Sequence, residues 1–411
     1  MEKISAVKGF ADHLPQDAAI FTRMGEVGRR IFKSYGYKEI QVPILEYTEL
    51  FARSIGVETD VVQKEMFTFP DRKGRSLTMR PEATAGIMRA YIEHAVYARE
   101  GLSKFFSFGP MFRYERPQKG RLRQFYQIDC ELLGAQEPQA DAEVLLMLMG
   151  FMRGIGLEEL DLDINNLGCK ACRPKYREQL KKFFDGLDKS GFCEDCLRRM
   201  DANVLRVLDC KLPRCSELSA GAPNLADNVC PECAEHFFTV RELLDRSGQA
   251  YRMNHRLVRG LDYYTRTTFE VVSGSIGAQS AVAGGGRYDG LVASLGGPEV
   301  PGIGFACGME RLALLMQEQA EEGLDFYLAV LDEKARNEAL LLAQQLRRGG
   351  FAGVSSFGSG SAKSQLRQAS RQKAKYCLIL GGNELEKGTV IVKNMESGEQ
   401  REENRAGLVS L

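Results

Sequence analysis

The 411-residue sequence predicts an α+β protein in three parts: an antiparallel-sheet domain, a cysteine-rich insertion within it, and a C-terminal α/β domain. Three observations predict this class. Segments of strand-like pattern meet mostly at short turns, as an antiparallel sheet requires. Eight of the eleven cysteines fall between Cys169 and Cys233. Beyond about Asp325, continuous apolar runs alternate with helical stretches, which is typical of a buried mixed sheet covered by helices.

The overall composition restricts the class of protein. A chain of this length exceeds what one core usually serves, and its 55 basic side chains balance 55 acidic ones. Any contact with nucleic acid must therefore come from local patches. No stretch reaches the roughly 18 apolar residues of a membrane span, and the N-terminus lacks the pattern of a signal peptide. We expect no membrane association and a cytoplasmic location.

The first domain is expected to open with an amphipathic helix over residues 18–36. Its apolar residues recur every three or four positions, and Gly36 is a typical stop. Residues 39–43 then alternate as a strand that Pro43 ends. The later elements are expected in this order: strands at residues 105–112, 125–133, 267–272 and 281–284, and a helix over 308–320.

The C-terminal domain is expected to have three buried strands, at residues 326–331, 376–380 and 390–392. A basic ridge is expected on one helix between them, formed by Lys363, Arg367, Arg371 and Lys375. These cations recur every four residues and therefore share one helix face. Such a ridge either binds a polyanion or is a plain solvated face, and the spacing leaves both open.

The turn between the strands at 105–112 and 125–133 is rich in cations. Five cationic side chains lie around one carboxylate, that of Glu115. Planar guanidinium groups donate in pairs to phosphate or carboxylate oxygens, so this turn predicts a polyphosphate ligand. A solvated hairpin tip is the competing interpretation, because charged runs are usual there.

The cysteines of the insertion form four short pairs: Cys169 with Cys172, Cys193 with Cys196, Cys210 with Cys215, and Cys230 with Cys233. A C-x-x-C turn places two thiolates on one side of a knuckle, and two such turns complete a tetrahedral Zn²⁺ shell. Disulfides are the competing account, although a cytoplasmic protein is kept reduced. The spacing predicts structural zinc, in as many as two sites, and does not tell which pairs combine.

Five blocks of sequence, in order, carry a family resemblance. Residues 112–125, Phe-Arg-x-Glu-Arg-Pro followed by Gln-x-Gly-Arg-x-Arg-Gln-Phe, resemble motif 2 of the class II aminoacyl-tRNA synthetases, in the form found in histidyl-tRNA synthetases. Residues 259–265, Arg-Gly-Leu-Asp-Tyr-Tyr-Thr, resemble the histidine-specific motif, and residues 302–312 resemble motif 3. The blocks at 80–84 and 283–289 agree with this family.

The resemblance implies a division of the chain. The class II catalytic domain would occupy residues 1–165, with motifs 1 and 2, and 241–322, with the histidine motif and motif 3. The cysteine-rich insertion would occupy 166–240, and an anticodon-binding domain 323–411. In this family the proline of motif 1 lies at the dimer interface, so Pro43 implies a homodimer; it would otherwise simply end an edge strand.

The resemblance also implies ATP-dependent activation of L-histidine and its transfer to the 3′-terminal adenosine of tRNA(His). Arg113 and Arg259 would be catalytic, facing each other across the pentavalent transition state. The implied ATP-binding residues are Arg113, Glu115, Arg121, Phe125 and Arg311. The implied histidine-binding residues are Glu82, Thr84, Gln127, Glu131, Arg259, Tyr263, Tyr264 and Tyr288. Contacts to tRNA would come from Gln118, Lys363, Arg367 and Arg371. Mg²⁺ is expected with ATP, without an assignable protein ligand.

Two other functions stay open. A catalytically silent paralogue of this family is the regulatory subunit of ATP phosphoribosyltransferase, and it typically lacks the histidine motif and the terminal domain that this chain has. A zinc-dependent nucleic-acid-binding protein would explain the cysteines and the basic ridge, but it leaves the arginine blocks without a role. The zinc prediction rests on spacing alone, because many members of the family have an insertion without such cysteines.

Overall fold

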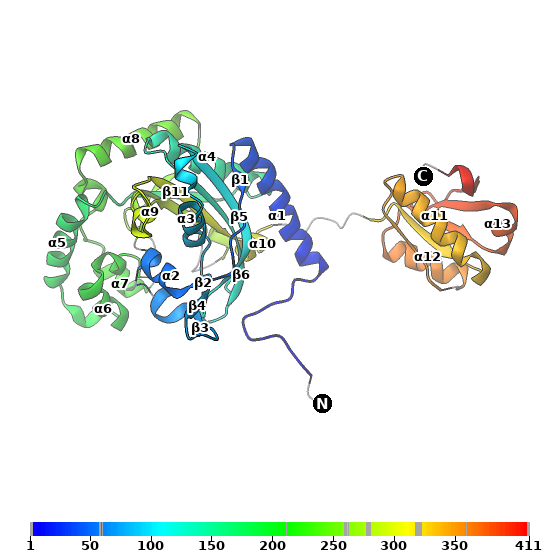
Figure 1. Ribbon diagram of the computed structural model, residues 1–411, viewed down its shortest axis with the longest axis horizontal. Helices are drawn as coiled ribbons and strands as arrows, with labels where there is room; N and C mark the ends of the chain where they lie inside the picture. Colours follow the sequence, from blue (N-terminus) through cyan, green and yellow to red (C-terminus); the bar gives the residue numbers. More distant parts are fainter. Residues whose placement is uncertain are drawn as a thin grey trace. The chain divides into compact units, whose positions relative to one another are not determined.

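The computed structural model describes residues 3–56, 59, 61–210, 212–258, 261, 263–276, 281–316, 323–358 and 360–408. The chain divides into two compact units, Met1–Gln317 and Glu318–Leu411, whose elements are labelled in Figure 1. In the described part of the chain, none of the helices has the length and apolar character that crossing a membrane requires.

The first unit is built on a sheet that is antiparallel except at its edges. Among the described residues this sheet has eight strands, in the order β1-β5-β6-β11-β10-β9-β7-β8. The pairs β1–β5 and β7–β8 are parallel. The strands are β1 Lys38–Glu39, β5 Ser103–Phe112, β6 Gln124–Leu133, β7 Asp161–Asn166, β8 Arg252–Met253, β9 Thr265–Val272, β10 Ala281–Arg287 and β11 Gly302–Gly308. The predicted antiparallel sheet is thus confirmed.

The other elements of the first unit surround this sheet. A small antiparallel sheet has the order β2-β4-β3, with β2 Leu45–Tyr47, β3 Phe67–Pro70 and β4 Ser76–Met79. The helices outside the cysteine-rich insertion are α1 Pro15–Ser34, α2 Thr48–Ile55, α3 Thr84–Glu93, α4 Pro138–Gly154, α9 Leu291–Ser294 and α10 Met309–Ala313.

Two of the predicted elements are shorter than expected. The strand predicted over 39–43 stops at Glu39. The Ile40 amide still donates to the Phe106 carbonyl oxygen of β5 at 2.8 Å, and beyond it Arg80 Nη1 donates to the Val42 carbonyl oxygen at 2.9 Å. The helix predicted over 308–320 ends at Ala313 and turns follow to Met316. There the Leu315 amide already bonds the Leu312 carbonyl, a tighter pattern than that of an α-helix. Residues 317–320 lie outside the described residues.

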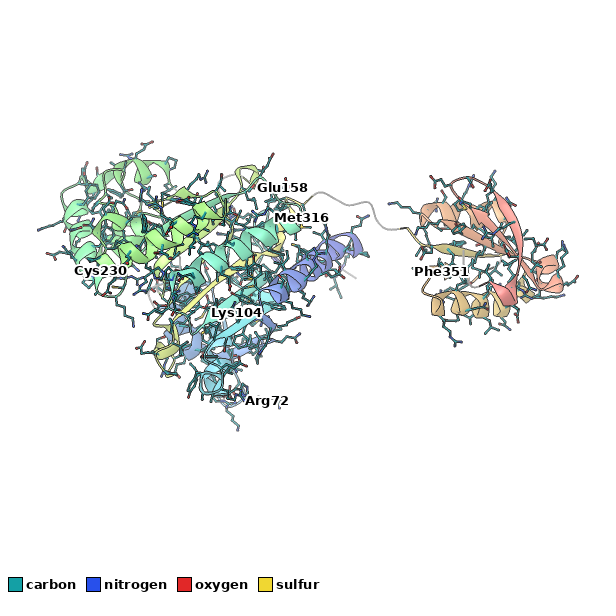
Figure 2. The ribbon with its side chains drawn as sticks, turned by 90° about the horizontal axis from the view of Figure 1, so that it is seen from above. Arg72, Lys104, Glu158, Cys230, Met316 and Phe351 are labelled. Atoms are coloured by element: carbon teal, nitrogen blue, oxygen red, sulfur yellow. The ribbon has the colours of Figure 1, made fainter. Side chains whose placement is uncertain are left out.

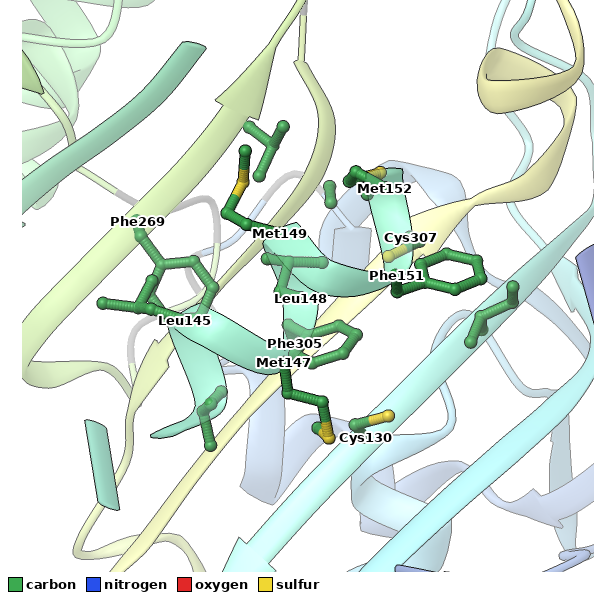
Figure 3. Close-up of a cluster of buried hydrophobic side chains, with 14 of the residues drawn as sticks. Cys130, Leu145, Met147, Leu148, Met149, Phe151, Met152, Phe269, Phe305 and Cys307 are labelled. Atoms are coloured by element: carbon green, nitrogen blue, oxygen red, sulfur yellow. The ribbon is translucent and has the colours of Figure 1, made fainter. Parts of the chain in front are cut away.

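The main core lies on one face of the large sheet, under α1 and α4. Figure 3 shows Leu145, Leu148 and Phe151 of α4 among Phe269 and Phe305 of the strands, and all five side chains are at most 3% exposed. A β-strand points alternate side chains to opposite faces. Burying every second residue of β6 against α4 therefore sends the residues between them to the other face.

A buried ion network ties α4 to the sheet. Arg287 of β10 and Asp141 of α4 have fully buried side chains, and Arg287 Nε donates to Asp141 Oδ1 at 3.0 Å. His236 Nε2 lies 2.9 Å from the other oxygen of Asp141. Breaking such a pair leaves an uncompensated buried charge.

We therefore expect Asp141→Asn to lower the free energy of unfolding by about 3 kcal/mol, measured by urea denaturation. Asp161→Asn is the matched control, because Asp161 pairs with Arg252 where both side chains are about half exposed. Its loss is expected to stay below about 1 kcal/mol. Equal effects of the two substitutions would contradict this account of the network.

The cysteine-rich insertion is helical. It contains α5 Cys172–Asp185, α6 Glu194–Ala202, α7 Pro213–Leu218 and α8 Pro231–Arg246, drawn in green in Figure 1. Most of its buried apolar side chains, among them Tyr176 and Val207, belong to one hydrophobic cluster with Tyr264 and Tyr288, while those of α8 pack in the main core. The insertion thus shares a core with two residues of the predicted histidine site.

The second unit is an α/β domain with a mixed sheet, as predicted. Among the described residues the strand order is β13-β12-β14-β15-β16; the pairs within β13-β12-β14 are parallel and the others antiparallel. The elements are β12 Phe326–Val330, α11 Arg336–Arg348, β13 Gly353–Ser355, α12 Ala362–Arg371, β14 Tyr376–Leu380, α13 Gly382–Lys387, β15 Thr389–Asn394 and β16 Gln400–Asn404.

The predicted basic ridge is one residue shorter than expected. Lys363, Arg367 and Arg371 are exposed on α12. Lys375 was wrongly included, because the helix ends at Arg371 and the Lys375 ammonium pairs with Asp325 at 2.8 Å.

Candidate active site

The first unit contains a cavity of about 620 Å³ on the sheet face that turns away from α4. Gln127, Asp129 and Glu131 of β6 line it, while the residues between them, Ile128 and Cys130, belong to the core. The strand alternation thus places three polar side chains side by side on the cavity wall. Of the residues predicted to bind substrate, these line the cavity: Glu82, Thr84, Arg113, Glu115, Arg121, Phe125, Gln127, Glu131, Tyr263, Tyr264, Tyr288 and Arg311.

Glu131 is fixed by two hydroxyl groups. Thr84 Oγ1 donates to Glu131 Oε1 at 2.6 Å, and the Tyr288 hydroxyl donates to Oε2. A Cβ atom on Gly304, in the neighbouring strand β11, would overlap Oε2, so glycine at this position makes room for the carboxylate. Both oxygens of Glu131 therefore have a defined direction before any ligand enters.

Three carboxyl groups at this end of the cavity have raised pKa values. Burial raises the pKa of Glu82 to about 7, against the charge of Arg113 and a hydrogen bond from Tyr263. Burial also raises the pKa of Asp129 to about 8, opposed by the charge of Arg80. It raises the pKa of Glu131 to about 8, opposed by the hydrogen bonds from Thr84 and Tyr288. A cationic ligand would favour the ionised forms of these groups.

Several buried acceptor atoms at this end have no hydrogen-bond partner among the described residues. They are Glu82 Oε1, Gln127 Oε1 and both carboxylate oxygens of Asp129. Buried polar atoms are normally paired, so an unpaired set in one cavity indicates a ligand that donates hydrogen bonds. This end of the cavity fits an ammonium group and further N–H donors.

Three arginines line another part of the cavity, together with the carboxyl groups of Glu115, Glu270 and Glu310. Arg113 lies with its guanidinium carbon 5.4 Å from the centre of the Phe125 ring, and its Nε donates to the Pro81 carbonyl oxygen at 2.9 Å. Arg121 pairs with Glu115 at 2.8 Å. Arg311 Nη1 donates to the Ala281 carbonyl oxygen at 2.6 Å, and burial and the charge of Arg121 lower its pKa. Three guanidinium groups around one space favour phosphate oxygens.

Arg311 does not have the surface position that a helix salt bridge with its neighbour would require. Glu310 instead accepts the backbone amide of Tyr126 with both oxygens, at 2.9 and 3.0 Å. Arg311 donates across to the Gly120 carbonyl oxygen, at 3.3 Å, in the loop that connects β5 and β6. It thus joins the motif 3 helix to the motif 2 loop.

Five predicted residues remain: one is exposed in the first unit, three belong to the second unit and one lies outside the described residues. Gln118 is exposed at the tip of the β5–β6 loop, where it forms a bridge with Arg121. Lys363, Arg367 and Arg371 belong to the second unit. Arg259 lies outside the described residues. On either side of it, Val258 is buried in the core and Leu261 lines the cavity.

Asp129 is a cavity residue that the sequence prediction missed. It is fully buried, lines the cavity and has no partner for either oxygen among the described residues. The signal was available, because Asp129 lies between Gln127 and Glu131 with the same strand alternation. A carboxylate at a polar position of an alternating strand is usually expected to face solvent, so the pattern alone does not single out Asp129 as a cavity residue.

The eight insertion cysteines gather into two groups of four. One contains Cys169, Cys172, Cys230 and Cys233, and the other contains Cys193, Cys196, Cys210 and Cys215. Within each group the sulfur atoms all lie within 4.8 Å of one another. All eight are free thiols, and each group offers four ligands to a metal ion. Figure 2 labels Cys230 in the helical insertion.

Comparison with known proteins gives a consistent result. Residues 9–312 match the family model described as histidyl-tRNA synthetase, and residues 325–411 match that of an anticodon binding domain. The chain is 60% identical over 400 residues to the histidine–tRNA ligase of Solidesulfovibrio magneticus, which covers 97% of this chain and 95% of the relative. It is 50% identical to that of Geobacter sulfurreducens, with 97% of each chain covered.

Solved structures agree. The crystal structure of apo histidyl-tRNA synthetase from S. aureus matches with a TM-score of 0.83 and 36% identity, over 99% of both chains. That of histidyl-tRNA synthetase from Nostoc sp. PCC 7120 has the same fold, with a TM-score of 0.70 at 20% identity over 99% of this chain and 98% of the other.

Proposed function

We infer the activity from one premise: the chain belongs to the histidyl-tRNA synthetase family. We propose that it activates L-histidine with ATP to histidyl-adenylate and then transfers histidine to the 3′-terminal adenosine of tRNA(His). The observation that carries this proposal is a single cavity lined both by three fully buried carboxyl groups, those of Glu82, Asp129 and Glu131, and by three arginines. That arrangement suits a substrate with an ammonium group whose own carboxylate must meet a phosphate.

The arginine end supports the first chemical step. The histidine carboxylate attacks the α-phosphorus of ATP, and negative charge develops on the phosphoryl oxygens and on pyrophosphate. Arg113 interacts electrostatically with both Glu82 and Arg311, and it is proposed to bridge the substrate carboxylate and the α-phosphate. Arg121 and Arg311 would hold the β- and γ-phosphates, and Phe125 would stack on adenine. Arg259 is proposed to approach from the opposite side.

The carboxylate end supports recognition of histidine. Glu82 and Thr84 are proposed to receive the ammonium group, and Asp129 adds a carboxylate beside them. Glu131 and Gln127 would bind the imidazole, which as a neutral ring needs one donor and one acceptor. The adjoining rings of Tyr263, Tyr264 and Tyr288 close this end, with ring centres of Tyr263 and Tyr288 5.8 Å apart.

Other partners follow from the same proposal. Mg²⁺ is expected with ATP; it prefers oxygen ligands, and Glu270 offers a carboxylate on the cavity wall. Exposed Lys363, Arg367 and Arg371 are proposed to contact tRNA(His) from the anticodon-binding domain, and Gln118 to contact its acceptor end. The insertion is proposed to bind structural Zn²⁺.

The division of the chain at 1–165, 166–240, 241–322 and 323–411 is proposed to correspond to these roles. A homodimer is also proposed. It is supported by the exposed apolar side chains Ile44 and Leu45 beside Pro43. A cytoplasmic location is proposed because protein synthesis and unpaired thiols both belong there.

Histidine binding is expected to depend on pH through Glu82. Its ammonium-binding form is the ionised one, and burial raises the pKa of this carboxyl to about 7. The affinity for histidine should rise about tenfold between pH 6 and pH 8, as Glu82 ionises. Titration calorimetry measures it. Glu82→Gln is the control for the ionisation of free histidine itself, and an unchanged pH dependence in that variant would contradict the assignment.

The raised pKa of Glu82 also affects the stability of the ligand-free protein, which changes with pH in the opposite direction to histidine affinity. The folded-state pKa of Glu82 lies above its ordinary value of 4.5. Its contribution to stability is therefore fully present below about pH 4.5 and is lost as pH rises toward 7. Bound histidine is expected to offset this loss.

The proposed function is tested by charging. Zinc-loaded protein should attach radiolabelled histidine, and no other amino acid, to a tRNA(His) transcript in the presence of ATP and Mg²⁺. Transfer that requires both ATP and the tRNA is the expected result. A folded protein that charges nothing would favour the regulatory paralogue instead.

A further inference from the structure

The two cysteine groups are nested along the chain. The first and fourth pairs form the outer cluster, which we define as Cys169, Cys172, Cys230 and Cys233. The second and third pairs form the inner cluster, Cys193, Cys196, Cys210 and Cys215. The inner cluster therefore closes a loop of chain that the outer cluster encloses.

The sulfur geometry fits a tetrahedral metal better than a disulfide. Cys169 and Cys172 sulfurs are 3.6 Å apart, and those of Cys193 and Cys210 are 4.0 Å apart. Zn–S bonds of about 2.3 Å in a tetrahedron put the sulfurs roughly 3.8 Å apart, whereas a disulfide needs about 2.05 Å. Backbone amides also donate to sulfur, from Cys230 to Cys172 at 3.1 Å and from Cys193 to Cys215 at 3.3 Å.

The two clusters have different surroundings. The outer cluster is fastened to the large sheet, because Asn166 of β7 donates to the Cys233 carbonyl oxygen at 2.9 Å. The inner cluster borders the substrate cavity: Cys193 and Cys210 line it directly. Arg199 of α6 and Arg206 line it as well, together with Asp195 and Asp209, so this part of the insertion contributes two cations and two carboxylates to the cavity wall.

One side chain connects the inner cluster to the histidine motif. Arg256 donates to Ser219 Oγ at 2.7 Å, to the Ser216 carbonyl oxygen at 3.2 Å and to the Leu208 carbonyl oxygen at 3.3 Å. Ser216 follows Cys215 directly, and Leu208 is close to Cys210 in the chain. Arg256 itself lies in the segment that leads to Arg259.

We propose that the inner cluster binds a Zn²⁺ ion. This ion positions one wall of the substrate cavity and, through Arg256, the chain that leads into the histidine motif. Occupancy of the inner site therefore controls histidine activation. The outer cluster binds a second Zn²⁺, which fastens the insertion to the sheet. The effect on activity rests on the proposed function, whereas the two metal sites do not. Arg256 is a positioning residue and does not touch the substrate.

The pairing is tested by metal analysis of the full-length protein, which should contain two zinc ions per chain. Cys193→Ser with Cys210→Ser removes two ligands of one nested site, so one zinc should remain. Cys169→Ser with Cys193→Ser damages both sites, so zinc should fall toward zero. If Cys193→Ser with Cys210→Ser removed both zinc ions and Cys169→Ser with Cys193→Ser removed only one, each site would combine pairs that are neighbours in the sequence. That result would overturn the nested sites. Iron in place of zinc, or disulfides found by mass spectrometry, would overturn the zinc assignment.

The coupling is tested by histidine-dependent pyrophosphate exchange. The inner double variant should lose at least about tenfold in kcat/KM for histidine, at a temperature where circular dichroism shows it folded. Cys169→Ser with Cys230→Ser is the matched control, with one zinc lost from the outer site, a lower Tm and a smaller loss of kcat/KM. Wild-type kcat/KM in the inner variant would overturn the coupling.

Arg256 provides a second variant if the inner double variant does not fold. Arg256→Gln should keep two zinc ions per chain and raise KM for histidine several-fold, with partial rescue in Arg256→Lys. An unchanged KM would overturn the connection. Absence of exchange in zinc-loaded wild type would count against the proposed function alone, because zinc counts and calorimetric histidine binding still decide the sites and their coupling.

Discussion

Arg113→Ala is expected to lower kcat/KM for histidine-dependent pyrophosphate exchange by about 100- to 1,000-fold. Removing one preorganised donor from developing charge typically has an effect of this size. Arg113 is held ready by its bond to the Pro81 carbonyl oxygen and by the Phe125 ring. Loss of Arg113 would also remove the positive charge that counteracts the burial-driven rise in the pKa of Glu82.

Arg116→Ala is the matched control for this prediction. Arg116 lies in the same loop and is exposed, and it does not line the cavity. The exchange rate of the Arg116→Ala variant should stay within about twofold of wild type, because Arg116 lies outside the cavity and the exchange assay contains no tRNA that an exposed loop residue could contact. Equal losses in both variants would show that the loop acts only through its overall charge.

Glu131→Gln is expected to raise KM for histidine about 10- to 100-fold. Both oxygens of Glu131 accept hydrogen bonds, from Thr84 and from Tyr288. Glutamine cannot carry the negative charge proposed to accept from the imidazole N–H, and losing a charged acceptor has a cost of about 1–3 kcal/mol. The exchange assay at varied histidine concentration measures the change, and KM for ATP should move much less.

Glu93→Gln is the control at the far end of α3, the helix that begins at Thr84. Glu93 is exposed and pairs with Arg89. The Glu93→Gln substitution should change KM for histidine and KM for ATP by no more than about twofold each, since exposed ion pairs contribute little. A Glu131→Gln enzyme with wild-type KM for histidine would contradict the assignment of this end of the cavity.

Sequence patterns predicted five strands of the large sheet, because these have a clear alternation between turns, but they did not predict β7, β8 and β11. Residues 125–133 are the strongest example, since β6 covers Gln124–Leu133. The contact that holds the chain just after the first strand could not be predicted, because Arg80 reaches the Val42 carbonyl from 38 residues away in the chain. A contact of that kind leaves no local signal.

The candidate site was predicted mainly by its motifs, and the structure added what motifs do not encode. The cavity showed that Asp129 lines the same wall as Gln127 and Glu131, although the strand alternation alone already placed these three on one face. The nested combination of the cysteine pairs required the folded insertion, because four pairs of similar spacing can combine in several ways. The role proposed for Arg256 rests on hydrogen bonds to residues 208, 216 and 219, which sequence distance conceals.

The central claim is that this cavity activates histidine with ATP. It is tested most directly by histidine-dependent exchange of labelled pyrophosphate into ATP, comparing the wild type with Arg259→Ala and offering the other amino acids as controls. Exchange with histidine alone, lost in the variant, is the predicted result. Folded, zinc-loaded wild type that catalyses no exchange, or a variant as active as the wild type, would contradict the account.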